Sequence, residues 1–188
     1  IDGIREVSLT TNGVLLAGMV PALAAAGLAR VNVSVDSLDP ERFAAITRRD
    51  DLHRVLEGLR AALAEPRLRP VKVNAVVMRG LNEDDILPLA GFARENDVVM
   101  RFIEVMPLDA PRRWTPDRVM SGAEVRDIIG RRWPLEPVGR GHTADTGVRF
   151  RFADRPDRLI ETVSSVTESF CAACDRLRLT ADGLLRTC

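Results

Sequence analysis

The stretch VKVNAVVMRGLNEDDILPLAGFARENDVVMRFIEV, residues 71–105, carries the clearest pattern for the fold class of this chain. Its first part, Val71–Met78, is apolar and rich in β-branched residues, which favours a buried strand. The acidic run at 82–85 then begins a helix, because carboxylates stabilise the positive end of the helix dipole. The apolar run Val98–Val105 predicts a second strand. Strand, helix and strand in this order predict two parallel neighbours in one sheet.

The same alternation extends back to the beginning of the sequence. Strands are predicted at Ile4–Leu9 and Val31–Val35, and each is followed by a helical pattern. The first helix ends at Gly27, a typical C-terminal cap, and the next begins at Asp39, an N-cap residue followed by Pro40. We therefore predict an α/β fold, an incomplete TIM-like barrel of parallel strands. A complete barrel would need more strand–helix units, so the sequence looks truncated at its front.

The second half of the sequence has a different character. Proline and arginine become frequent, and residues 110–118 are predicted to form a loop. Ser121 and Glu124 fit a capping box at the start of a short helix. Short strands are then predicted at Val148–Phe152, Leu159–Val163 and Leu177–Thr180. We therefore divide the chain into a barrel part, residues 1–107, and a β-rich C-terminal extension, residues 108–188.

Composition narrows the class of protein. The chain has 188 residues, of which 46% are hydrophobic, and its formal net charge is zero. This length is enough to bury a core, and the neutral charge counts against binding to nucleic acid. No run is apolar and long enough to cross a membrane, and no signal-peptide pattern opens the sequence, so we expect a soluble, cytoplasmic protein. Lys72 is the only lysine among many arginines.

The three cysteines, Cys171, Cys174 and Cys188, all lie near the end of the chain. An odd number clustered in this way argues against a disulfide framework and for a metal centre. Two cysteines two residues apart can hold a metal from a tight turn, and a hairpin around Gly183 would bring back the third. His53 and His142 are not at ligand spacing from the cysteines. Spacing alone leaves an iron–sulfur cluster and a zinc site equally open.

The run FCAACDRLRLTADGLLRTC, residues 170–188, resembles the second cluster motif of the radical-SAM GTP 3′,8-cyclase family, that of molybdenum cofactor biosynthesis protein A. Further blocks resemble the same family in order and spacing: LTTNG at 9–13, NVSVDSLD at 32–39, FAAITRRD at 43–50, VKVNAVVMRGLNEDD at 71–85 and RFIEVMP at 101–107. The fold that the resemblance implies is a partial radical-SAM barrel with a C-terminal extension that carries a second [4Fe–4S] cluster.

The resemblance also implies which residues form the site. The positions that match contacts to GTP are Thr10, Lys72, Arg176, Leu177 and Arg178. The positions that match contacts to S-adenosylmethionine (SAM) are Ser34 and Met106, and those that match ligands of the second cluster are Cys171, Cys174 and Cys188. Lysine and arginine suit a triphosphate, and two arginines at i and i+2 of a strand would project from the same face.

The activity implied by the resemblance is the conversion of GTP to 3′,8-cyclo-7,8-dihydro-GTP by a SAM-derived radical. The implied cofactors are [4Fe–4S] clusters and SAM. The implied partners are GTP, a reductant and the cyclic pyranopterin synthase that acts next, with neither nucleic acid nor membrane, and a homodimer stays open. The family's first cluster motif would lie upstream of Ile1 and its C-terminal tail beyond Cys188, so we expect this fragment to be inactive alone.

Two other interpretations remain open from the residues. One is a different radical-SAM enzyme with an auxiliary cluster, which would bind no GTP. The other is a zinc-stabilised binding module without catalysis, which would hold zinc instead of iron on its cysteines. One departure from the family pattern is Asp175, where the family commonly has asparagine.

Overall fold

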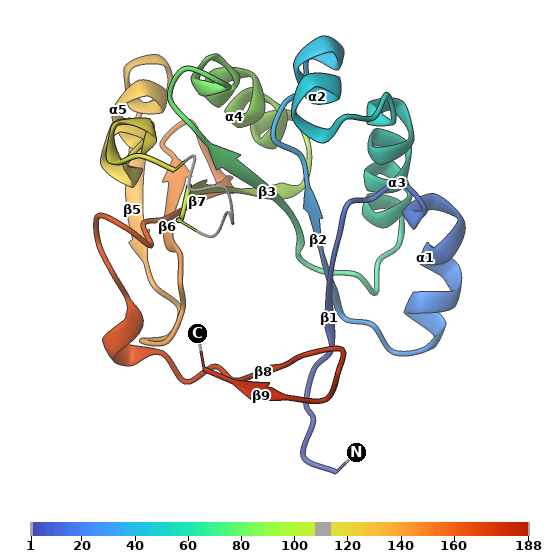
Figure 1. The fold of residues 1–188 in the computed structure, drawn as a ribbon. Coiled ribbons are helices and arrows are strands. Elements are labelled where there is room, and N and C mark those ends of the chain that lie inside the picture. The colour runs from blue at the N-terminus through green and yellow to red at the C-terminus, as the bar shows by residue number, and fades with distance from the viewer. Residues whose placement is uncertain (1, 108–113, 188) are drawn as a thin grey trace.

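The computed structural model describes residues 2–107 and 114–187, which form one large sheet with helices outside it and a small hairpin (Figure 1). The large sheet has seven strands in the order β1-β2-β3-β4-β7-β6-β5. Its strands are β1 (Ser8–Thr11), β2 (Arg30–Ser34), β3 (Val71–Val77), β4 (Val98–Glu104), β5 (Leu135–Gly139), β6 (Val148–Phe152) and β7 (Arg155–Val163). The hairpin consists of β8 (Arg178–Leu179) and β9 (Leu185–Arg186). The α-helices are α1 (Leu16–Ala25), α2 (Pro40–Thr47), α3 (Leu52–Ala64), α4 (Ile86–Glu95) and α5 (Gly122–Arg132). Short 3-10 helices are η1 (Glu83–Asp85), η2 (Pro116–Arg118) and η3 (Cys171–Ala173).

Most of the large sheet is parallel. The pairs β1–β2, β2–β3, β3–β4 and β4–β7 are parallel, whereas β7–β6 and β6–β5 are antiparallel. Helices connect the successive parallel strands, and in Figure 1 they lie on the outer side of the curved sheet. The predicted α/β fold with a mostly parallel sheet is therefore confirmed. Strand β7 continues this parallel sheet directly after β4, with Met100 paired to Ile160.

The hydrophobic core lies between the sheet and the helices. Side chains alternate between the two faces of a strand, and every second residue of β2, β3 and β4 is buried. The buried residues of β2, β3 and β4 that pack in this core are Val31, Val33, Val71, Val73, Ala75, Val77, Val98, Met100 and Phe102. The intervening residues of these strands consequently face the side of the sheet that the helices leave uncovered.

The local signals for helix ends are confirmed. Asp39 caps α2, because its carboxylate accepts a hydrogen bond from the backbone N–H of Arg42 at 2.8 Å. The Ser121 hydroxyl accepts from the backbone N–H of Glu124, and the Glu124 carboxylate accepts from the backbone N–H of Ser121, as a capping box requires. Gly27 follows α1 with a φ of 89°, the left-handed conformation that ends helices.

Several predicted strands have different boundaries in the structure, and the strand predicted at Leu159–Val163 begins earlier, at Arg155. The first strand begins at Ser8 instead of Ile4, because pairing with β2 starts only where Ser8 meets Arg30. The strand predicted at Leu177–Thr180 covers only Arg178–Leu179, so Arg176 lies before it. The alternation argument that placed Arg176 and Arg178 on one strand face was therefore wrong. Part of the loop predicted at 110–118, residues 110–113, lies outside the described residues.

In the parts of the chain that the structure describes, no helix is long and apolar enough to span a membrane.

Candidate functional site

Polar side chains form two rows across the uncovered face of the sheet. The rows follow from strand register, because paired residues on neighbouring parallel strands lie side by side. The first row consists of Thr10, Asn32 and Lys72, and the second of Ser34, Asn74, Arg101 and Glu161. The two rows bring five predicted or charged positions, from β1, β2, β3, β4 and β7, onto one surface.

Glu161 joins the cations of two different strands. Its Oε1 lies 2.8 Å from Lys72 Nζ, and its Oε2 lies 2.7 Å from Arg101 Nε. The Glu161 side chain is only 6% exposed, and those of Lys72 and Arg101 are 19% and 18% exposed. A buried carboxylate is stable in such a place only when cations or hydrogen-bond donors compensate its charge. The two cations supply that compensation and are held in fixed positions by it.

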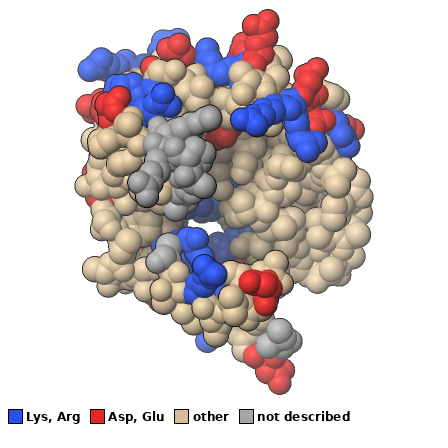
Figure 2. Space-filling view, in the orientation of Figure 1, with Lys and Arg blue, Asp and Glu red and all other residues tan. Residues whose placement is uncertain are grey.

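A cavity of about 270 Å³ opens beside this cluster. Its charged lining consists of Arg30, Lys72, Arg101, Arg149, Asp145 and Glu161. Four cations line the cavity against two carboxylates, and Glu6 pairs with Arg30, so one positive charge remains in excess. Such a site attracts an anionic ligand. The space-filling view shows blue lysine and arginine atoms along parts of the edge of a gap near the centre of the molecule (Figure 2).

Of the predicted GTP contacts, Lys72 lines the cavity directly. Thr10 lies in the same row, where its hydroxyl accepts a hydrogen bond from Asn32 Nδ2 at 3.2 Å. Arg176 and Leu177 lie elsewhere in the chain, between η3 and the β8–β9 hairpin, and Arg178 is the first residue of β8. Leu177 is 70% exposed. The strands therefore bring Thr10 and Lys72 onto one row, while the other three contacts belong to a separate C-terminal segment.

The predicted SAM contacts lie at the carboxyl ends of β2 and β4. Ser34 is the last residue of β2 and is exposed, and Met106 follows β4 by two residues and is also exposed. Ligand sites of parallel barrels are built at this end of the strands. Both residues are thus accessible to a ligand. Strand β3 lies between β2 and β4, so the two residues stand at the ends of strands that are not direct neighbours.

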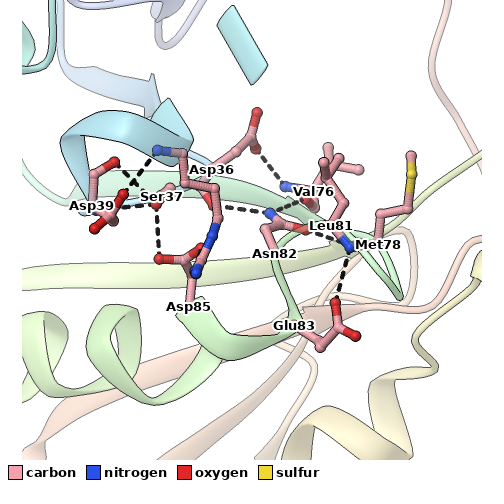
Figure 3. Close-up of polar contacts among 10 residues, drawn as sticks. Asp36, Ser37, Asp39, Val76, Met78, Leu81, Asn82, Glu83 and Asp85 are labelled. Atoms are coloured by element: carbon pink, nitrogen blue, oxygen red, sulfur yellow. Dashed lines mark hydrogen bonds and ion pairs between the residues drawn. The ribbon is translucent and has the colours of Figure 1, made fainter. Parts of the chain in front are cut away.

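A hydrogen-bonded network fixes the loops after β2 and β3 (Figure 3). The Asn82 amide donates to the carbonyls of Asp36 and Val76, and its oxygen accepts from the backbone N–H of Met78 at 2.8 Å. Asp36 Oδ1 accepts from the backbone N–H of Val76, and burial raises the pKa of Asp36. Many polar residues of the NVSVDSLD and GLNEDD segments therefore hold the loops that follow these two strands.

A second part of this network is a buried carboxylate. Asp85 accepts hydrogen bonds from the Ser37 hydroxyl at 2.8 Å and from Arg42 Nη1 at 2.6 Å, and its side chain is 2% exposed. The contact joins the start of α4 to the start of α2, which gives Asp85 a structural role.

The cysteine segment forms a tight turn. Cys171 is the first residue of η3, and Cys174 is the residue directly after η3. Arg176 Nε donates to Cys174 Sγ at 3.2 Å, and its guanidinium lies 5.3 Å from the centre of the Phe170 ring. The backbone N–H of Arg176 and then its side chain lower the pKa of the Cys174 thiol. The turn thus favours the thiolate form that binds metals.

Cys188, the third predicted ligand, lies outside the described residues. Cys171 and Cys174 are free thiols, exposed and half-buried respectively. Among residues 2–107 and 114–187, no group of three His, Cys, Asp or Glu side chains is arranged to hold a metal. The donor chemistry of the described pair, two accessible sulfurs with one thiol biased toward thiolate, fits an iron–sulfur cluster.

Comparisons with known proteins match both parts of the chain. The family described as "Radical SAM superfamily" matches residues 1–93, and the family described as "Molybdenum Cofactor Synthesis C" matches residues 98–188. The GTP 3′,8-cyclase of Streptomyces coelicolor is 45% identical over 183 residues, which cover 97% of this chain. This chain belongs to the GTP 3′,8-cyclase family of radical SAM proteins.

Other members of the GTP 3′,8-cyclase family match the whole chain. A GTP 3′,8-cyclase of Xanthomonas campestris pv. campestris is 42% identical over 189 residues, 100% of this chain and 55% of the relative. Molybdenum cofactor biosynthesis protein 1 of Homo sapiens is 41% identical, with 100% of this chain and 29% of the relative covered. The chain covers 53% of the Streptomyces protein. It therefore spans about half the length of the bacterial relatives.

Two solved structures share the fold of this cyclase-family chain. A radical SAM methyltransferase from Sphaerobacter thermophilus has a TM-score of 0.52 and 18% identity, and the match covers 69% of this chain and 37% of that protein. TYW1 with a lysine-pyruvate adduct bound has a TM-score of 0.51 and 13% identity, with 72% and 44% covered. At these identities the likeness concerns the fold alone.

Membership of the radical SAM superfamily implies an iron–sulfur cluster and SAM as cofactors. The sequence motifs indicated the family and Lys72, but they did not indicate Arg101 and Glu161, the two residues that form ion pairs beside the cavity. Each is a charged residue among apolar neighbours in a strand, and that pattern was the available signal. That pattern could not show which residues pair with each other, because only the folded sheet brings Glu161 to Lys72.

Proposed function

We propose that this chain is part of a GTP 3′,8-cyclase, which converts GTP to 3′,8-cyclo-7,8-dihydro-GTP in molybdenum cofactor biosynthesis. The observation that carries the proposal is the electropositive cavity beside Lys72, Arg101 and Glu161 on the uncovered face of the sheet. The printed names of relatives at 41–45% identity support it. An anionic nucleotide needs fixed cations, and the cluster supplies them in set positions.

Two groups of residues would bind the GTP in this proposal. Lys72 faces the cavity and suits the triphosphate, and Thr10 lies in the same row as a neutral hydrogen-bonding group. Arg176, Leu177 and Arg178 would contact the nucleotide from the C-terminal segment, directly after the cysteine turn. Enclosure between these groups would also keep water away from a reactive radical.

SAM would be held at the carboxyl ends of the strands by Ser34 and Met106. Their exposure at the ends of β2 and β4 supports this role, and the network around Asp36 and Asn82 keeps the adjoining loops in place. When bound, SAM and its cluster would supply the radical that removes hydrogen from C3′ of GTP. The residues of this chain would orient the nucleotide toward that chemistry.

Cys171, Cys174 and Cys188 would hold a second [4Fe–4S] cluster. The turn geometry of the first two and the lowered pKa of Cys174 support thiolate ligation. Three protein ligands leave one iron of such a cluster open to the guanine base.

We also propose that the chain is divided into a barrel part, residues 1–107, and an extension, residues 108–188. A reductant and the cyclic pyranopterin synthase remain the proposed partners.

The decisive experiment is an anaerobic assay of the full-length enzyme that carries this chain, with GTP, SAM and dithionite. We expect mass spectrometry to detect 3′,8-cyclo-7,8-dihydro-GTP, and its formation to stop when SAM is omitted. Equimolar ATP in place of GTP should give no cyclised nucleotide. If the reconstituted enzyme cleaves SAM but turns over a peptide and never GTP, the proposal is wrong.

A further inference from the structure

Glu104, the last residue of β4, is a buried carboxylate with four hydrogen bonds. Its Oε1 accepts from the backbone N–H of Gly122 at 3.0 Å and from the Thr167 hydroxyl at 2.6 Å. Its Oε2 accepts from the backbone N–H groups of Val166 and Thr167 at 2.8 and 2.9 Å. The residue is 2% exposed, so water cannot replace these donors.

The four donors come from two segments that are far from β4 in the sequence. Gly122 is the first residue of α5, and Val166 and Thr167 lie between β7 and η3. Three of the four bonds hold the second segment, whose Thr167 precedes Cys171 by four residues. The Glu104 carboxylate therefore links the segment that precedes the cysteine turn to the end of β4. Met106 follows the end of β4 by two residues.

The hydrogen bonds keep this carboxylate ionised despite its burial. Burial raises the pKa of Glu104, but the bonds from Thr167, Val166 and Gly122 together outweigh it and hold the pKa below its usual value. The charge also lies at the positive end of the α5 dipole. Charge-assisted hydrogen bonds are the strong kind, so the attachment is rigid.

Arg126 gives the same segment a second, weaker support. Its Nη1 donates to the Thr162 hydroxyl at 3.0 Å, and its Nη2 lies 3.7 Å from Glu168. The Glu168 carboxylate is 49% exposed, so this ion pair contributes little compared with the buried carboxylate. The path of the chain into the cysteine turn consequently depends mainly on Glu104.

We propose that Glu104 is a positioning residue for the proposed C-terminal cluster. Its carboxylate sets the distance between the strand end that leads to the SAM contact Met106 and the turn that carries Cys171 and Cys174. The inference rests on the proposed function, because it assumes that a cluster forms on these cysteines and that GTP binds beside it. Glu104 touches no substrate; it acts by holding the ligand-bearing segment.

The test is Glu104→Gln in the reconstituted full-length enzyme. Glutamine keeps the volume but turns one acceptor into an NH₂ group that faces N–H donors, so at least one bond is lost. We expect iron content to be retained, the EPR spectrum of the C-terminal cluster and its change on adding GTP to alter, and KM for GTP to rise about tenfold. SAM cleavage without GTP, read as 5′-deoxyadenosine, should match the wild type.

Asp85→Asn is the matched control. Asp85 is equally buried and accepts two hydrogen bonds, but its partners Ser37 and Arg42 belong to the loop and helix after β2. This variant should lose stability without altering the cluster spectrum or KM for GTP. An unchanged spectrum and KM in Glu104→Gln, with the same loss of stability as in the control, would overturn the inference.

Thr167→Val keeps the experiment decisive if Glu104→Gln fails to fold. It removes only the hydroxyl bond of 2.6 Å and leaves the three backbone donors in place. We expect a smaller spectral change in the same direction, and a wild-type spectrum would contradict the proposal. The EPR readout needs no product: an altered spectrum in an enzyme that never cyclises GTP would support the role of Glu104 and refute the proposed function.

Discussion

Lys72 Nζ lies 2.8 Å from Glu161 Oε1, although 89 positions separate the two residues in the sequence. The contact crosses one strand, because β4 lies between β3 and β7, which carry the two residues. Arg101 on β4 meets the other oxygen of the same carboxylate. One negative charge thus holds two cations, and the remaining positive charge is available to an anionic ligand in the adjoining cavity.

Replacing this lysine should weaken GTP binding. In Lys72→Ala the cavity loses one of its fixed cations, whereas Arg101 keeps its partner Glu161. Because a hydrogen bond to a charged group contributes about 1.5–3 kcal/mol, we expect KM for GTP to rise about ten- to hundredfold, with a smaller change in kcat. Steady-state kinetics of the full-length enzyme measure both.

The control for this prediction is Arg60→Ala, which removes an exposed cation from α3 on the outer side of the sheet. Its KM for GTP should equal that of the wild type. Equal KM values for Lys72→Ala and Arg60→Ala would mean that the cavity beside Glu161 does not receive the triphosphate.

Another prediction concerns the TTNG segment, in which Gly13 has a structural role separate from that of Thr10. Gly13 has a φ of 81°, and an added Cβ would lie 2.8 Å from Val33 Cγ1 and 3.0 Å from Val55 Cγ1. Gly13→Ala should therefore lower the free energy of unfolding by about 2 kcal/mol, through backbone strain and overpacking. Urea denaturation of the full-length enzyme gives the value.

Gly18→Ala is the matched substitution in the same region. Gly18 is exposed in α1, and an added Cβ would meet nothing within 4 Å. Alanine has the higher helix propensity, so this variant should be more stable than the wild type by about 0.5–1 kcal/mol. Equal effects at Gly13 and Gly18 would show that the close approach to Val33 and Val55 is not a constraint.

Local sequence signals predicted much of this fold but not the contacts that build the site. The N-cap at Asp39 and the capping box at Ser121 depend on residues within one turn of each other, so the sequence alone reveals them. The contact of Glu161 with Lys72 depends instead on β7 pairing in parallel with β4, which no local pattern encodes. Motif resemblance indicated Lys72, but neither its partner nor the carboxylate of Glu104.

The stability of the enzyme should depend on acid pH through Glu124. The backbone N–H of Ser121, then Arg79 and the Ser121 hydroxyl, lower the pKa of Glu124 from 4.5 to about 2. Because the folded-state pKa is lowered, this contribution is complete above about pH 4.5 and is lost as the pH falls toward about 2. Glu124→Gln should therefore be clearly less stable than the wild type near neutral pH and closer to it in acid.

Urea midpoints at about pH 6 and about pH 3 measure this difference. Glutamine can still fill the N3 position of a capping box, so the variant removes mainly the charge. The control is Glu57→Gln, at an exposed position of α3. Its urea midpoint should differ from that of the wild type by the same small amount at both pH values. If the urea midpoints of Glu124→Gln and the wild type differ by the same amount at both pH values, the assigned pH window is wrong.

Metal analysis tests the cysteine turn directly. Cys171 and Cys174 are accessible thiols on one turn, and the Arg176 contacts favour the thiolate of Cys174. After anaerobic reconstitution of the full-length enzyme, Cys171→Ala should contain about four fewer irons per chain than the wild type, because a [4Fe–4S] cluster cannot be held by the remaining thiolates. Ser169→Ala, which removes a hydroxyl beside the same turn, should keep its iron. Stoichiometric zinc in the wild type, lost in Cys171→Ala while iron content stays equal, would instead identify this turn as a structural zinc site.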